Sequence, residues 1–158
     1  MTEWIIRFIK NRDLILKRII SIDEKKEEDI IIANLEDNKK HIYLIVPFLD
    51  ESDIKETLKK LKGYDFATLV VYNTKENKEF LINNWDKLAK FNKGFSIHFV
   101  NPFSKTNKRW SIYPATHEFI AGKKNLKKGI SSISSNVEEI AKKEIEDIYK
   151  KFITPKKE

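Results

Sequence analysis

The residues best suited to chemistry lie in one basic stretch between positions 87 and 130. This stretch holds ten lysine and arginine side chains and only one acidic side chain, Glu118, so it carries +9 of formal charge while the rest of the chain is close to neutral. Aromatic residues are interleaved with these cations. Because cations pair with phosphates and rings stack on bases, the stretch predicts a nucleic-acid-binding surface. The candidate binding residues are Lys105, Lys108, Arg109, Trp110, Lys123, Lys124, Lys127 and Lys128.

The alternative for the same stretch is structural. Lysines on exposed faces are routine solubility residues, and Trp110 and Tyr113 would then fix their segment to the core. The three histidines, His41, His98 and His117, lack the spacing of metal ligands, so we expect structural roles for them. His117 stands apart because Glu118 follows it, but an acid/base pair there would need a nucleophile that the sequence does not identify.

Residue types that are absent or rare exclude several kinds of site. The chain has no cysteine, which excludes disulfides and thiolate chemistry. Its four glycines form neither of the common phosphate-binding loops. No apolar run is long enough to span a bilayer and no signal peptide is apparent, so we expect a cytoplasmic protein without membrane partners. Abundant Lys, Glu and Ile favour an archaeal source.

The pattern of elements predicts one α/β domain over residues 1–158. Strands that alternate with helices imply parallel pairing, and a hairpin before them makes the sheet mixed, in a three-layer α/β/α arrangement. The expected elements are a helix at 3–20, a charged linker at 23–28, a hairpin from 29–33 and 41–48, helices at 50–63 and 74–88, and strands at 66–72 and 95–100.

The C-terminal part has a different character. Residues 104–134 are expected to be a basic, irregular segment that contains one short edge strand near Arg109. Asn136 with Glu139 resembles a capping box that would start a final helix over 135–153. Open strand edges are compatible with a homodimer.

The order of elements in residues 1–103 resembles that of the restriction-endonuclease-like nucleases. In that family an Asp on the first strand of the hairpin and a Glu-x-Lys on the next bind a divalent metal beside the scissile phosphate. Asp29 matches the first position. Leu44, Ile45, Val46 and Pro47 stand where Glu-x-Lys is expected, so the resemblance implies a degenerate site.

Three hypotheses follow. The first is a non-catalytic interaction protein, similar in kind to the archaeal proteins that interact with TATA-binding protein, with nucleic acid or a transcription-related factor as partner and no metal or cofactor. The second is a magnesium-dependent nuclease with Asp29, Asp50 and Glu51 as its catalytic carboxylates. The third is a purely protein-binding module. The missing Glu-x-Lys favours the first.

Overall fold

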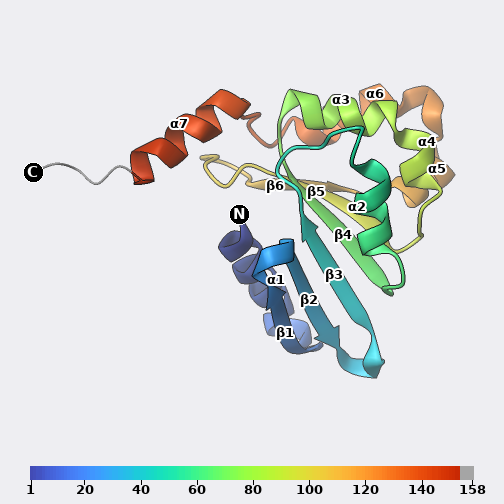
Figure 1. The fold of residues 1–158 in the computed structure, drawn as a ribbon. Coiled ribbons are helices and arrows are strands. Elements are labelled where there is room, and N and C mark those ends of the chain that lie inside the picture. The colour runs from blue at the N-terminus through green and yellow to red at the C-terminus, as the bar shows by residue number, and fades with distance from the viewer. Residues whose placement is uncertain (154–158) are drawn as a thin grey trace, which may run out of the picture.

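The computed structural model describes residues 1–153, which form a six-stranded mixed sheet with helices on both faces (Figure 1). This confirms the predicted α/β class and agrees with a three-layer arrangement. The strands lie in the sheet in chain order: β1 to β3 form an antiparallel meander, β3 to β5 run parallel, and β6 is antiparallel to β5. They are β1 (Ile19–Lys25), β2 (Ile30–Leu35), β3 (Lys40–Ile45), β4 (Phe66–Tyr72), β5 (Phe95–Val100) and β6 (Arg109–Ile112).

Helices supply the crossovers between the parallel strands. α2 connects β3 to β4, and α3 with α4 connects β4 to β5. No helix within residues 1–153 is both long and apolar enough to cross a membrane. The helices are α1 (Thr2–Leu16), α2 (Ile54–Leu61), α3 (Lys75–Asn83), α4 (Trp85–Ala89), α5 (Pro114–Ala121), α6 (Leu126–Ser134) and α7 (Lys142–Ile153), with 3-10 turns at Lys26–Glu28, Glu36–Asn38 and Lys123–Asn125.

The larger core lies between the sheet and α2, α3, α4 and α6. Side chains alternate along a strand, so Leu69 and Val71 of β4 face this core with Ile97 and Phe99 of β5. Trp85 of α4 is fully buried among them. On the opposite face of the sheet, a second cluster packs against the apolar side of α1. α7 adds a small third cluster at the carboxyl end of β4.

The predicted helix at 3–20 is too long. α1 ends at Leu16, and Lys17 adopts a left-handed conformation with φ of 50°. The side chain of Asp13 accepts hydrogen bonds from the backbone N–H groups of Arg18 and Ile19, which turns the chain away from the helix. Ile15, next to the end of the helix, is 91% exposed.

The predicted charged linker at 23–28 is also wrong over its first half. Residues 19–25 form β1, so the expected hairpin is a three-stranded meander. Pairing with β2 stabilises this strand despite its charge, and Asn34 donates hydrogen bonds to Ser21 and Asp23 across the pair. The connection between β1 and β2 is the short turn Lys26–Glu28.

Residues 104–134 are more regular than predicted. The expected edge strand is present as β6, but α5 and α6 fill most of the remainder. Pro114 begins α5, where its missing N–H costs nothing, and Leu126 and Ile130 give α6 a buried stripe. Two short helices separated by Gly122 carry too little periodicity for sequence reasoning to detect.

The last helix begins at Lys142 and not near residue 135, and the predicted capping box does not form. The chain before it is held by an asparagine instead. The side chain of Asn73, which is fully buried, donates to the carbonyl oxygens of Val137 and Glu138, both at 3.1 Å, and accepts from Trp110 Nε1 at 2.8 Å. These bonds keep residues 137 and 138 out of a helix, since their carbonyls are already engaged by the Asn73 side chain.

We expect Asn73→Ala to lower the free energy of unfolding by about 3 kcal/mol, because it leaves buried donors and acceptors without partners. Urea unfolding of the variant and the parent measures this loss. Asn83→Ala, at an exposed position near the end of α3, is the matched control and should change stability by less than about 0.5 kcal/mol. Similar losses in both variants would contradict the role given to Asn73.

Candidate functional site

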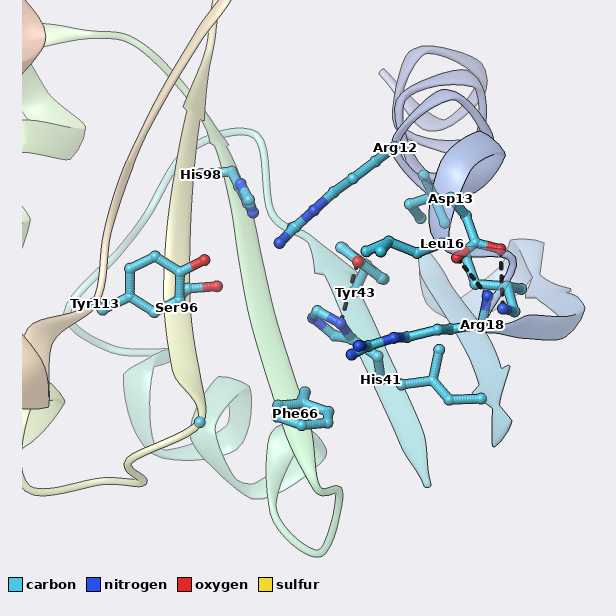
Figure 2. Close-up of a pocket in the computed structure, with 14 residues that line it drawn as sticks. Arg12, Asp13, Leu16, Arg18, His41, Tyr43, Phe66, Ser96, His98 and Tyr113 are labelled. Atoms are coloured by element: carbon cyan, nitrogen blue, oxygen red, sulfur yellow. Dashed lines mark hydrogen bonds between the residues drawn. The ribbon is translucent and has the colours of Figure 1, made fainter. Parts of the chain in front are cut away.

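A pocket of about 290 Å³ lies between the C-terminal half of α1 and the amino ends of the parallel strands (Figure 2). We call it the α1 pocket. Its floor is the sheet and one wall is α1, whereas Tyr113 stands on the opposite side. It is lined by Ile9, Arg12, Asp13, Leu16, Arg18, Ile19, Leu35, His41, Tyr43, Phe66, Gly94, Ser96, His98 and Tyr113.

The floor of the pocket is polar because strand alternation brings polar side chains to one face. Thr68 of β4 lies opposite Ser96 of β5, and His98 of β5 lies opposite Ser111 of β6. A chain of hydrogen bonds crosses three strands, from His41 Nε2 to Thr68 Oγ1 and from there to Ser96 Oγ, each at 2.8 Å. Every link is made between side chains of the floor, so this surface is held rigidly.

Arg109 supports the floor from the edge strand β6. Its guanidinium donates to His98 Nδ1 at 3.1 Å and also to the hydroxyl of Ser111. Since arginine can only donate, His98 Nδ1 is the acceptor and carries no proton. The same guanidinium lies 4.4 Å from the centre of the Phe8 ring, a cation–π contact with α1.

The pocket carries net positive charge, because its lining has two arginines, Arg12 and Arg18, and one acidic residue, Asp13. Figure 2 shows the side chains of Arg12 and Arg18 extending from the α1 side across the space above the floor. Neither forms an ion pair with any residue in 1–153. Asp13 is the acidic residue of the lining, and its two oxygens already accept the N–H groups of Arg18 and Ile19. An anion is therefore the ligand that this charge distribution favours.

The two histidines are neutral near pH 7. Burial, with a smaller effect of Arg12, lowers the pKa of His41 to about 4. Burial and then the Arg109 charge hold the pKa of His98 well below its ordinary value. The floor thus offers neutral groups beneath the arginines.

The hydroxyl groups of the floor are poor nucleophiles. Burial raises the pKa of the Tyr43 hydroxyl to about 12. The hydroxyls of Thr68 and Ser96 are buried and engaged with one another. This arrangement suits binding better than nucleophilic chemistry.

The predicted basic residues are divided among the start of α6, the loop before β6 and β6 itself. Lys123, Lys124, Lys127 and Lys128 gather at the start of α6, beside Ile82 of α3 and thus on the side of the larger core. Lys123 pairs with Asp86 at 2.8 Å. Lys105 and Lys108 lie in the loop before β6, and the ammonium of Lys108 donates to the carbonyls of Pro102 and Ser104. Only Arg109 of the predicted set contacts the floor of the α1 pocket.

Trp110 belongs to the core. It is 5% exposed, and its ring stacks on Phe99 with 4.1 Å between the ring centres. Trp110 therefore has the structural role that was the alternative interpretation of its segment. Its ring presents no face on which a base could stack. Tyr113 does not share that role, because it is 44% exposed and lines the α1 pocket.

The three candidate nuclease carboxylates are not brought together. Asp29 is exposed at the start of β2 with φ of 54°. Asp50 and Glu51 lie before α2, beside Glu76 and Glu79 of α3. Residues 1–153 contain no group of three or more histidine or carboxylate side chains placed to hold a metal ion.

His117 and Glu118 lie on α5 and not at the α1 pocket. The His117 ring packs edge-on against Trp85, and its buried Nε2 has no hydrogen-bond partner in the described chain. Glu118 accepts a hydrogen bond from Trp85 Nε1. Both side chains therefore contact the same tryptophan of α4.

Sequence reasoning missed Arg12, Arg18, His41, His98 and Ser96 as site residues. A usable signal existed, since central parallel strands are normally apolar on both faces, whereas β3 and β5 carry polar residues at alternate positions. The arginines gave no such signal because they lie among other cations at the end of α1.

No family model, no curated protein and no solved structure matches this chain. The geometry of the α1 pocket therefore carries the functional argument.

The depressed pKa of His41 makes stability depend on pH. Between about pH 6.5 and pH 4 the unfolded chain binds a proton at His41 that the folded chain does not, so stability falls as the pH drops through this window. When the pH drops from about 7.5 to about 5, we expect the free energy of unfolding of His41→Gln to fall by about 2 kcal/mol less than that of the parent. Urea unfolding at both pH values measures this, and an identical pH dependence in the two proteins would refute it.

Proposed function

We propose that this protein is a non-catalytic binding module for nucleic acid, and that the α1 pocket receives a phosphate of the bound strand. The observation that carries this proposal is a pair of guanidinium groups, Arg12 and Arg18, that have no ion-pair partner within residues 1–153 and line a pocket without a free carboxylate. Arginine binds phosphate through paired N–H donors, and the neutral floor adds no competing negative charge.

The shape of the pocket favours a single strand over a duplex. Its volume of about 290 Å³ is at the lower end for small-ligand sites, enough for a phosphate with part of one nucleotide. Phe66 and Tyr113, 37% and 44% exposed, line it and offer rings on which a base can stack. A base in a duplex is already stacked and paired, so it would have to leave the helix to reach them.

The architecture part of the proposal is a restriction-endonuclease-like fold whose cleavage site is degenerate. Its support is the order of elements, with a leading helix, antiparallel strands, a helix, and parallel strands joined by helices. The apolar residues opposite Asp29 support the loss of cleavage, since Ile45 donates its N–H to the Asp29 carbonyl where a second carboxylate would be needed. A transcription-related factor that itself binds nucleic acid is the protein partner consistent with this role.

We expect Arg12→Gln with Arg18→Gln to weaken binding of a fluorescent single-stranded oligonucleotide at least about tenfold at low salt. The slope of log affinity against log salt should flatten by about 0.7, because one phosphate of the single strand is no longer neutralised. Fluorescence anisotropy over a salt series, with DNA and RNA oligonucleotides, measures both. Arg7→Gln is the matched control, because Arg7 lies on the same helix but is paired with Glu3.

Two further variants separate the competing hypotheses. If replacing Lys123, Lys124, Lys127 and Lys128 by Gln flattens the slope and the arginine variants do not, the contact surface is the start of α6 and the α1 pocket has no part in it. Cleavage of the oligonucleotide with magnesium or manganese, abolished in Asp29→Ala, would establish the nuclease hypothesis instead. Absence of binding to either nucleic acid would favour the protein-binding hypothesis and overturn the proposal.

A further inference from the structure

One buried side chain of the α1 pocket has a hydrogen-bond donor without an acceptor. His98 lines the pocket, is 1% exposed, and accepts at Nδ1 from the Arg109 guanidinium at 3.1 Å. Because the ring is neutral and Nδ1 carries no proton, the proton lies on Nε2. Nε2 has no hydrogen-bond partner within residues 1–153, and Figure 2 shows the ring directed toward the space that Arg12 also enters. A buried donor in this position favours an acceptor on a ligand.

The cations around this donor exceed the charge of one internal phosphate. Arg12 and Arg18 line the pocket, and Arg109 lies beside its floor in contact with His98. Burial lowers the pKa of Arg109, and the charge of Arg12 lowers it further, so these two guanidinium groups are close enough to repel each other. Against the three arginines the lining has one carboxylate, that of Asp13, which leaves an excess of two positive charges. An internal phosphodiester carries one negative charge, whereas a phosphate monoester carries about two at pH 7.

The size of the pocket also favours the end of a strand. Its volume of about 290 Å³ admits a phosphate with part of one nucleotide. An internal phosphate has a nucleoside on each side, so it would bring two nucleosides to a space that holds part of one. A terminal phosphate brings a single nucleoside, whose base can lie against Phe66 or Tyr113 in the same lining.

We propose that the phosphate received by the α1 pocket is the monoester at the end of a nucleic-acid strand, bound by Arg12, Arg18 and the Nε2 proton of His98. This inference rests on the proposed function and names the part of the strand that the pocket recognises. A monoester has three terminal oxygen atoms, so the two guanidinium groups and the imidazole can each have a separate acceptor. A phosphodiester has two such atoms and leaves one of these three donors without one.

Single strands of one sequence that differ only at their ends test the proposal. They carry a 5′-phosphate, a 3′-phosphate or hydroxyl groups at both ends, and fluorescence anisotropy with the full chain compares their affinities. We expect one of the two terminal phosphates to tighten binding at least about tenfold, because it adds charge-assisted hydrogen bonds. Arg12→Gln with Arg18→Gln, both at exposed positions that preserve folding, should abolish this advantage. Arg7→Gln, which removes an arginine paired with Glu3 on the same helix, is the matched control and should keep it.

The outcomes separate this inference from the proposed function. Equal binding of the three strands, weakened by the arginine substitutions, would overturn the inference and leave the proposed function intact. Absence of binding to any strand would refute the proposed function itself. A free mononucleotide carries the same monoester, so it serves as a competitor. If it displaces the labelled strand at concentrations as low as those of the unlabelled phosphorylated strand, the pocket recognises a mononucleotide and the inference is wrong.

The Nε2 proton of His98 gives a second readout that needs no substitution. In a chain with isotope-labelled histidine, we expect the imidazole N–H signal of His98 to move downfield when the phosphorylated strand binds, because the proton gains a phosphate acceptor. The strand with hydroxyl ends should move it less. His117 on α5 lies outside the pocket lining and is the internal reference. A His98 signal that stays unchanged with the phosphorylated strand bound would overturn the proposal.

Discussion

One helix, α1, must cover most of one face of a six-stranded sheet, and it is too narrow to do so. An α-helix is about 10 Å wide and strands lie about 4.8 Å apart, so α1 can cover about two strands along its length. Its buried residues Ile5 and Ile9 meet β2 and β3 and the carboxyl-terminal halves of β4 and β5, at Val70 and Val100. The amino ends of β4 and β5 stay uncovered by this helix, and the α1 pocket is the result.

The floor of the pocket is polar although it is buried. Thr68 and Ser96 are almost inaccessible to solvent, and their hydroxyl groups form hydrogen bonds with one another and with His41. Burial keeps His41 and His98 neutral, so charge at the pocket comes from the arginines around the floor. Incomplete coverage thus provides a concave surface, and the alternation of side chains provides its chemistry.

The end of α1 couples this pocket to the open edge of the sheet. Asp13 stops the helix by accepting the N–H groups of Arg18 and Ile19, and the same turn exposes Ile15 and directs the chain into β1. One local capping interaction therefore sets the position of Arg18 at the pocket and of Ile20 at the edge. The α1 pocket and the exposed edge of β1 lie on either side of one helix end.

The sequence by itself determined the class of the fold and most of its elements, because α2, the cap of α3 at Thr74, and the strands β3 to β6 have strong local patterns. Local pattern misjudged β1, α5, α6 and the start of α7, where pairing with β2 or hydrogen bonds from Asn73 outweigh propensity. The excess of positive charge at 87–130 could be predicted from the sequence. The division of that charge among α6, the loop before β6 and the edge strand β6 could not. Only the tertiary structure decided which residues share a pocket, since Arg12, His41 and Ser96 are distant along the chain and meet through strand register and helix packing.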